Sequence, residues 1–191
     1  MLRSLRRYFT SAPFILGLLG GSIFLIVLYT SLAEVPDAEY QYRDDGIITL
    51  SHARNLVDHG HIGVDPSGKR VEGFSAPVQF WAYTVAYALT GVHWQAFCTI
   101  QTFLGTFFLG FIFIQFFGKR FLAGLFGSFL GAFFLSFHYR FLEWHASGME
   151  NAWTHVLFLA TVYVAWRMVE NREIRWWWLI WPVLACLSRL D

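Results

Sequence analysis

The sequence predicts an all-α integral membrane protein with about five transmembrane helices. Three observations lead to this fold class. The chain has 191 residues, of which 56% are hydrophobic and only 14% are charged, which is too little charge to cover the surface of a soluble domain. Its apolar residues are gathered into several long runs. The first of these runs has about 20 residues, enough for a helix to cross a bilayer.

The first apolar run, from Ala12 to Ala33, follows three basic residues, Arg3, Arg6 and Arg7. A cleaved signal peptide has the same plan, but the run is longer than the usual apolar core of a signal peptide. We therefore predict a retained first helix that begins on the cytoplasmic side.

A polar segment follows this helix and holds eight of the thirteen acidic residues. We predict that it forms a first extracytoplasmic loop over residues 34–74, since it leaves the far end of the first helix. Further apolar runs come after it, at 75–92, 94–116, 121–138, 151–168 and 174–187.

The orientation of these runs depends on whether 75–92 crosses the membrane. If it does not, the basic residues between the later runs join the N-terminal arginines inside, as the positive-inside rule favours. These residues are Lys119, Arg120, Arg167, Arg172 and Arg175. We therefore predict that 75–92 is an interfacial or re-entrant helix, in which Gln79, Tyr83 and Tyr87 suit the interface.

This topology places a second extracytoplasmic loop at 139–150. The two loops and the final stretch, LSRLD, then emerge on the same face of the membrane. LSRLD reads as the start of another polar loop, so we expect residues 1–191 to be the N-terminal module of a longer protein.

Asp44 and Asp45 open a helical pattern of apolar residues that ends at Gly60. One interpretation is structural: Asp44 caps the helix and Asp45 interacts favourably with its dipole. Another is a general base near the membrane surface, where a neighbouring carboxylate and partial burial raise a pKa. A divalent cation that bridges the pair is a third interpretation.

The stretch HASGMEN presents a similar choice. Ser147 and Glu150 have the spacing of a capping box that opens the next transmembrane helix. The same glutamate could instead line a polar site together with Arg140, Glu143 and His145.

The remaining reactive residue types have ordinary structural explanations. Cys98 and Cys186 both lie inside apolar runs, so we expect neither a disulfide framework nor a thiolate metal site. His59 and His61 have the spacing of a weak metal site, but solvated loop histidines explain them as well. Gly127 and Gly131 form a small-xxx-small pair, which predicts close helix packing.

Several basic residues fall on the outer side in this topology: Arg54, Lys69, Arg70, Arg140 and Arg189. Loop solvation accounts for such residues in general. An anionic phosphate at the interface would also need them as partners.

Three stretches, in the same order, resemble motifs of the GT-C glycosyltransferases that use polyprenyl-phosphate sugars, closest to the terminal arabinofuranosyltransferase branch. The first, DDGIITLSHARNLVDHGHIGVDPSGKRVEGFSAPVQFW, has an acidic pair, an ARN helix, a glycine-rich turn and VEG before an aromatic-rich helix. The second, WHASGMEN, matches a tryptophan followed by Ser-Gly-hydrophobic-Glu. The third, LSRLD, resembles Leu-Thr-Arg-Pro-Asp/Glu, with Leu190 in place of the proline.

The resemblance implies a catalytic base at Asp44 or Asp45, because an aspartate of this loop has that role in GT-C enzymes. It implies interfacial helices after the first loop as well. The residues expected to bind substrate are Arg54, Asn55, Arg70, Glu72, Arg140, Glu150 and Arg189. The family's remaining transmembrane helices and C-terminal soluble domain are absent from these 191 residues, so we expect the donor site to be incomplete in this chain alone.

The implied reaction moves a sugar, with inversion, from a polyprenyl-phosphate donor to a glycan, lipid or protein acceptor of the cell envelope. A pentose such as arabinofuranose is favoured, and a hexose or aminoarabinose is the alternative. The implied location is the inner membrane, with a cytoplasmic N-terminus and an extracytoplasmic active site. We expect no nucleic-acid partner. The resemblance implies no particular cofactor, and it leaves open whether the reaction uses a divalent cation.

Two other functions compete with this one: a transporter fragment and a non-catalytic membrane scaffold. Transporters place ionisable groups near the bilayer midplane. The centres of the predicted spans here hold essentially no Asp, Glu, Lys or Arg, and the nearest exception is His155. This pattern disfavours transport.

Overall fold

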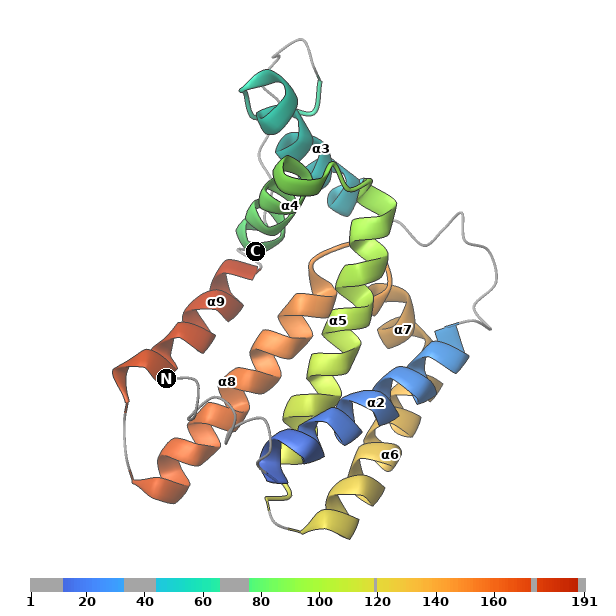
Figure 1. The fold of residues 1–191 in the computed structure, drawn as a ribbon, viewed down its shortest axis with the longest axis vertical. Coiled ribbons are helices and arrows are strands. Elements are labelled where there is room, and N and C mark those ends of the chain that lie inside the picture. The colour runs from blue at the N-terminus through green and yellow to red at the C-terminus, as the bar shows by residue number, and fades with distance from the viewer. Residues whose placement is uncertain (1–11, 33–43, 66–75, 119, 173–174, 189–191) are drawn as a thin grey trace.

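The computed structural model describes residues 12–32, 44–65, 76–118, 120–172 and 175–188. The described elements are all helical, and none of these residues forms a strand (Figure 1). The predicted all-α class is confirmed.

Three helices are long and apolar enough to cross a membrane: α2 (Ala12–Leu32), α5 (Trp94–Gln115) and α8 (Asn151–Asn171). Two shorter apolar segments accompany them, α6 (Phe121–Phe137) and the pair η2 (Trp176–Leu179) and α9 (Ile180–Ser188). All five agree closely with predicted spans. The number of helices that actually cross a bilayer stays a prediction.

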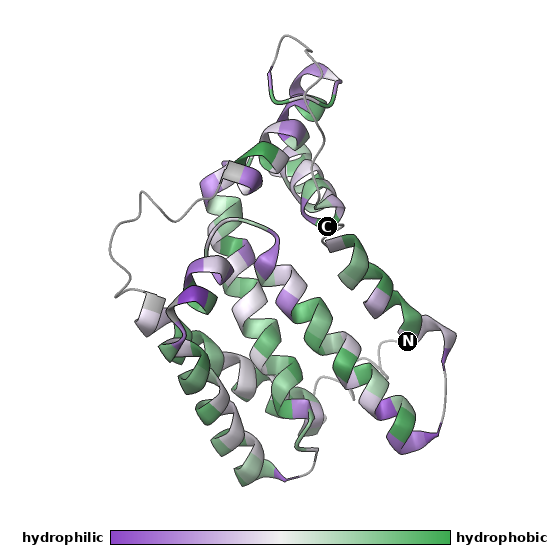
Figure 2. Cartoon of the chain, turned by 180° about the vertical axis from the view of Figure 1, so that it is seen from behind, coloured by the Kyte–Doolittle hydropathy of each residue, from purple (hydrophilic) through white to green (hydrophobic). Residues whose placement is uncertain are grey.

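The outer surface of this bundle is apolar, as a lipid-facing surface would be. On α6, Leu122 is 78% exposed, Phe134 75% and Phe137 72%. Figure 2 shows hydrophobic residues along the bundle helices and hydrophilic ones gathered in α3 and at helix ends.

The remaining helices lie at one end of the bundle. They are α3 (Asp44–His59), α4 (Pro77–Thr90) and α7 (Tyr139–His145). The chain passes from the end of α2 through α3 and α4 to the start of α5, so both stay at the same end of the bundle (Figure 1). The predicted helix that begins at Asp44 and stops at Gly60 is confirmed, and Gly60 has a φ of 74°.

Helix α7 was not expected, because its residues fall in a segment predicted to be a loop. It begins after His138, whose Nδ1 accepts a hydrogen bond from the Phe141 amide at 3.2 Å. A side-chain cap of this kind stabilises a helix too short to show a clear apolar period.

Helices α2 and α5 cross with their backbones in close contact, which was not predicted from the sequence. A Cβ on Gly20 would lie 2.6 Å from the Gly110 carbonyl oxygen, and one on Gly110 would lie 2.4 Å from the Gly20 carbonyl oxygen. Only glycine permits such an approach of two backbones. The predicted pair on α6 also packs closely, with Gly127 facing the Phe117 ring and Gly131 facing the Phe113 ring.

We predict that Gly110→Ala destabilises the bundle by about 1–3 kcal/mol, because the added methyl group meets a backbone carbonyl that cannot move alone. Gly124→Ala is the matched control, since its Cβ would lie 3.1 Å from the Ile114 side chain. Thermal unfolding of the purified protein in detergent, followed by tryptophan fluorescence, measures both. Equal losses of Tm in the two variants would contradict the assignment of this crossing.

Candidate functional site

The start of α3 packs against the loop that precedes α8. Gly46 is buried, and a Cβ on it would lie 2.8 Å from the Gly148 carbonyl oxygen and 3.2 Å from the Met149 amide nitrogen. We name residues 147–149 the SGM loop. Two stretches about 100 residues apart in the chain, DDG and SGME, therefore meet in space.

Two buried glutamines donate hydrogen bonds to backbone carbonyls of the SGM loop. Gln79 on α4 donates to the Gly148 carbonyl at 2.7 Å, and Gln101 on α5 donates to the Met149 carbonyl at 2.6 Å. The two side chains are also joined, because Gln79 Nε2 donates to Gln101 Oε1 at 3.3 Å. Gln79 is fully buried and Gln101 is 2% exposed. Buried carbonyls without a donor are costly, so these amides fix the loop.

The shape of the SGM loop depends on one backbone angle. Gly148 has a φ of 75°, in the left-handed region that L side chains rarely adopt. This turn directs the Gly148 carbonyl toward Gln79 and also toward Cys98, whose thiol donates to it at 3.6 Å.

An apolar cluster connects α3, α4 and α5 behind this contact. Leu50 and Ala53 of α3 pack with Phe80 and Tyr83 of α4 and with Cys98 of α5. Burial raises the pKa of Tyr83 to about 12, and its hydroxyl donates to the Val92 carbonyl at 3.3 Å. The cluster seats α3 so that its first turn faces the SGM loop.

The predicted acidic residues lie on both sides of the contact. Asp45, the residue before Gly46, is exposed, whereas Glu150, the residue after Met149, is 3% exposed. Asp44 is the first residue of α3, and its side chain lies outside the described residues. One of the acidic residues that flank the contact is therefore exposed, and the other is buried.

The predicted capping box is wrong. Helix α8 begins after Glu150, not after Ser147, and Glu150 makes no side-chain cap. The Ser147 hydroxyl instead donates to the Trp144 carbonyl at 2.7 Å and accepts from the Met149 amide at 3.4 Å. The left-handed Gly148 turns the chain away from a helix between these two positions.

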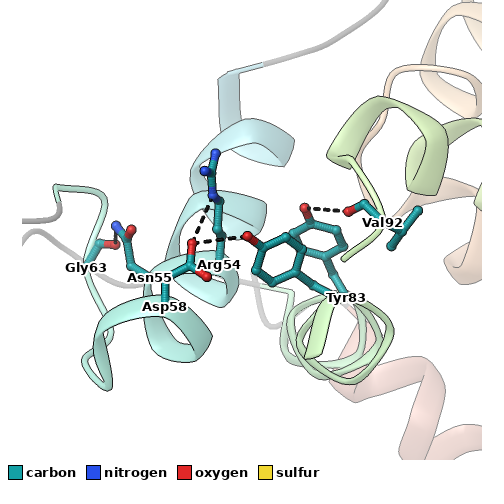
Figure 3. A network of polar contacts seen from close by, with 7 residues as sticks. Arg54, Asn55, Asp58, Gly63, Tyr83 and Val92 are labelled. Atoms are coloured by element: carbon teal, nitrogen blue, oxygen red, sulfur yellow. Dashed lines mark hydrogen bonds and ion pairs between the residues drawn. The ribbon is translucent and has the colours of Figure 1, made fainter. Parts of the chain in front are cut away.

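Arg54 and Asn55 do not join the acidic contact. They lie in the second half of α3, about 14 Å along the helix from Asp45 at 1.5 Å per residue. Asn55 donates to the Gly63 carbonyl at 2.6 Å and so holds the loop after the helix (Figure 3).

Arg54 is part of a second polar cluster, which joins α3 to α4. Its Nε pairs with Asp58 Oδ2 at 3.2 Å, and the Tyr87 hydroxyl donates to the same oxygen at 3.1 Å (Figure 3). The hydrogen bond to Asp58, followed by that of Tyr87, raises the pKa of Arg54. A polar cavity of about 240 Å³ opens here, lined also by Ser51 and His59.

Of the other predicted binding residues, Arg140 is exposed on α7, at the same end of the bundle as Asp45. Arg70, Glu72 and Arg189 lie outside the described residues. Among the described residues, no group of three or more His, Cys, Asp or Glu could hold a metal ion. The rings of His59 and His61 stack at 5.9 Å.

A histidine pair joins α7 to α8, with His145 buried and His155 half-buried, and its arrangement was not predicted. His145 Nδ1 and His155 Nδ1 are 3.0 Å apart, and the two rings are parallel within 8°. His145 Nε2 lies 2.9 Å from the Thr106 hydroxyl, and Phe141 stacks on both rings. Sequence spacing alone could not show this pair, since its members come from α7 and α8.

We predict that Gln79→Leu loosens the SGM loop, because it leaves the Gly148 carbonyl without its shortest hydrogen bond at a cost of about 1–3 kcal/mol. Hydrogen exchange of the peptide that covers residues 144–153 should speed up. Gln115→Leu is the matched control: it removes an exposed bond to the Pro13 carbonyl of 2.9 Å and should leave this peptide unchanged. Unchanged exchange in Gln79→Leu would refute the role given to this amide.

We predict that acid destabilises the fold through His145. Burial, with a smaller effect of His155, lowers the pKa of His145 from 6.5 to about 3. The unfolded chain therefore binds a proton that the folded chain does not, so stability falls as pH drops from about 6.5 to about 3, by up to about 1.4 kcal/mol per unit.

Thermal unfolding across this pH range measures the effect. His145→Gln should flatten the pH dependence of Tm, and His59→Gln, which replaces an exposed histidine, should retain it. A wild-type Tm that stays constant from pH 6.5 to 3 would disprove the prediction.

Comparisons with protein-family models, curated proteins and solved structures find no match to this chain.

Proposed function

We propose that the protein is a membrane glycosyltransferase of the GT-C type, which transfers a sugar from a polyprenyl-phosphate donor to a cell-envelope acceptor. A pentose such as arabinofuranose is the favoured sugar. The reaction takes place at the end of the bundle that carries α3 and the SGM loop.

One observation carries this proposal: the close approach of Gly46 to Gly148. It supports a shared site for the two acidic stretches that resemble GT-C motifs, which the chain order alone leaves apart. An apolar bundle with long helices directly below supports a substrate whose tail stays in lipid.

In the proposed mechanism, Asp45 or Asp44 takes the proton from an acceptor hydroxyl. The acceptor oxygen attacks the anomeric carbon, and the bond from that carbon to the phosphate oxygen breaks on the opposite face. Polyprenyl phosphate leaves with the electron pair, and the sugar is inverted. Asp45 suits the role of base because it is exposed beside the contact.

The leaving phosphate gains negative charge and needs a cation or hydrogen-bond donors nearby. Arg140 of α7 carries an exposed positive charge at this end of the bundle. Arg54 is already paired with Asp58, which also accepts a hydrogen bond from the Tyr87 hydroxyl, so we assign it to the seating of α3 on α4.

We predict that Asp45→Asn or Asp44→Asn lowers sugar transfer by about 10²–10⁴-fold, the usual contribution of a general base. Membranes that carry the protein are offered a panel of radiolabelled polyprenyl-phosphate pentoses and hexoses. Glu170→Gln is the control, because it removes an exposed carboxylate at the opposite end of α8.

Normal transfer in both aspartate variants would show that the pair only starts a helix. If the wild type consumes no donor from the panel, the result would favour a non-catalytic membrane scaffold over a glycosyltransferase. Gly46→Ala adds a geometric test, since it keeps both carboxylates but pushes α3 away from the SGM loop.

A further inference from the structure

A second cavity lies at the other end of the bundle from the α3–SGM loop contact. It has a volume of about 530 Å³, within the usual range for a ligand pocket, and its walls come from α2, α5, α8, η2 and α9. Its lining is mostly aromatic and includes Phe111, Tyr163, Trp178 and Trp181. We name it the aromatic cavity.

Ring contacts join aromatic side chains within two of the walls of the aromatic cavity. Phe14 of α2 meets Phe111 of α5 edge-to-face at 6.0 Å, and Trp177 meets Trp178 in the same way at 5.6 Å. Edge-to-face pairs of this kind add stability beyond their buried area. The cavity is therefore built into the fold, from segments far apart in the sequence.

The cavity opens where basic residues gather. Arg167 lines it, and Arg175 places its guanidinium 5.7 Å from the centre of the Trp178 ring. Arg120 and Arg172 lie at the same end, at the start of α6 and the end of α8. Among the residues that the structure describes at this end of the bundle, Glu170 is the one acidic residue.

Glu170 pairs with Arg167 at 3.0 Å, and the two side chains are 48% and 41% exposed. Exposed pairs of this kind are weak. The guanidinium of Arg167 has five donors, and its pair with Glu170 uses Nη1 alone. A stronger anion can therefore bind Arg167 in addition to Glu170 or in its place.

This combination fits one class of ligand. Aromatic walls suit a hydrocarbon chain, tryptophans and tyrosines gather where a bilayer meets water, and basic pockets between transmembrane helices bind anionic headgroups. We propose that the aromatic cavity holds an acyl chain of an anionic phospholipid, with the headgroup phosphate beside Arg167. This site does not depend on the proposed transferase activity.

Native mass spectrometry of the purified protein, titrated with phosphatidylglycerol or with phosphatidylcholine of the same chains, tests the proposal. The wild type should retain one phosphatidylglycerol in preference to phosphatidylcholine by about fivefold, the effect of one basic residue near an anionic surface. Arg167→Gln should lose this preference. Arg120→Gln, which removes an exposed charge of the same end outside the cavity, should keep it.

A variant that fills the cavity separates the chain from the headgroup. Ala160 lines the cavity and is 4% exposed, so Ala160→Phe should reduce retention of both lipids, whereas Val162→Phe changes an exposed position of α8 and should not. Circular dichroism identifies any variant that fails to fold, and Arg167→Lys, which keeps the charge, should then retain the preference. Equal retention of the two lipids by the wild type, an unchanged preference in Arg167→Gln, or a second copy of the chain bound in place of lipid would overturn the proposal.

Discussion

The arrangement of this protein depends on a need to satisfy two buried backbone carbonyls. The SGM loop turns inside the protein, where an unpaired carbonyl of Gly148 or Met149 would be costly. The donors are side-chain amides of α4 and α5, each placed within 2.7 Å of its acceptor. One of these amides belongs to Gln79 of α4, so the loop also determines where α4 can lie. Helix α3 packs on α4 and is therefore positioned by the same contact.

This dependence explains why the polar end of the molecule is ordered around glycines. Gly46 lets α3 approach the loop, and Gly148 supplies the left-handed turn that the loop requires. The apolar cluster of Leu50, Phe80 and Tyr83 then holds α3 on α4, together with the polar contacts of Asp58 to Arg54 and Tyr87. An exposed acidic residue, Asp45, thus lies at the head of α3 close to a loop whose carbonyls are held by side-chain amides.

Much of the helical layout could be predicted from the sequence, because apolar run length and the Asp44-to-Gly60 period are local properties. The features that were predicted wrongly or missed depend on contacts with residues far away in the sequence. Ser147 and Glu150 have capping-box spacing, but a left-handed Gly148 between them prevents it. The burial of Gln79 on a carbonyl 69 residues away also depends on a contact that the sequence does not predict. The crossing of Gly20 and Gly110, and the His145–His155 pair, likewise depend on contacts between distant helices.

The thiol of Cys98 gives this architecture a chemical reporter. It is buried at the junction and donates to the same Gly148 carbonyl as Gln79, while Cys186 is exposed. Cys98 is 2% exposed, so a small alkylating reagent reaches its thiol when the segments packed around it separate. The ratio of modification at the two cysteines therefore records how often the junction opens in the native bilayer, with no foreign label introduced.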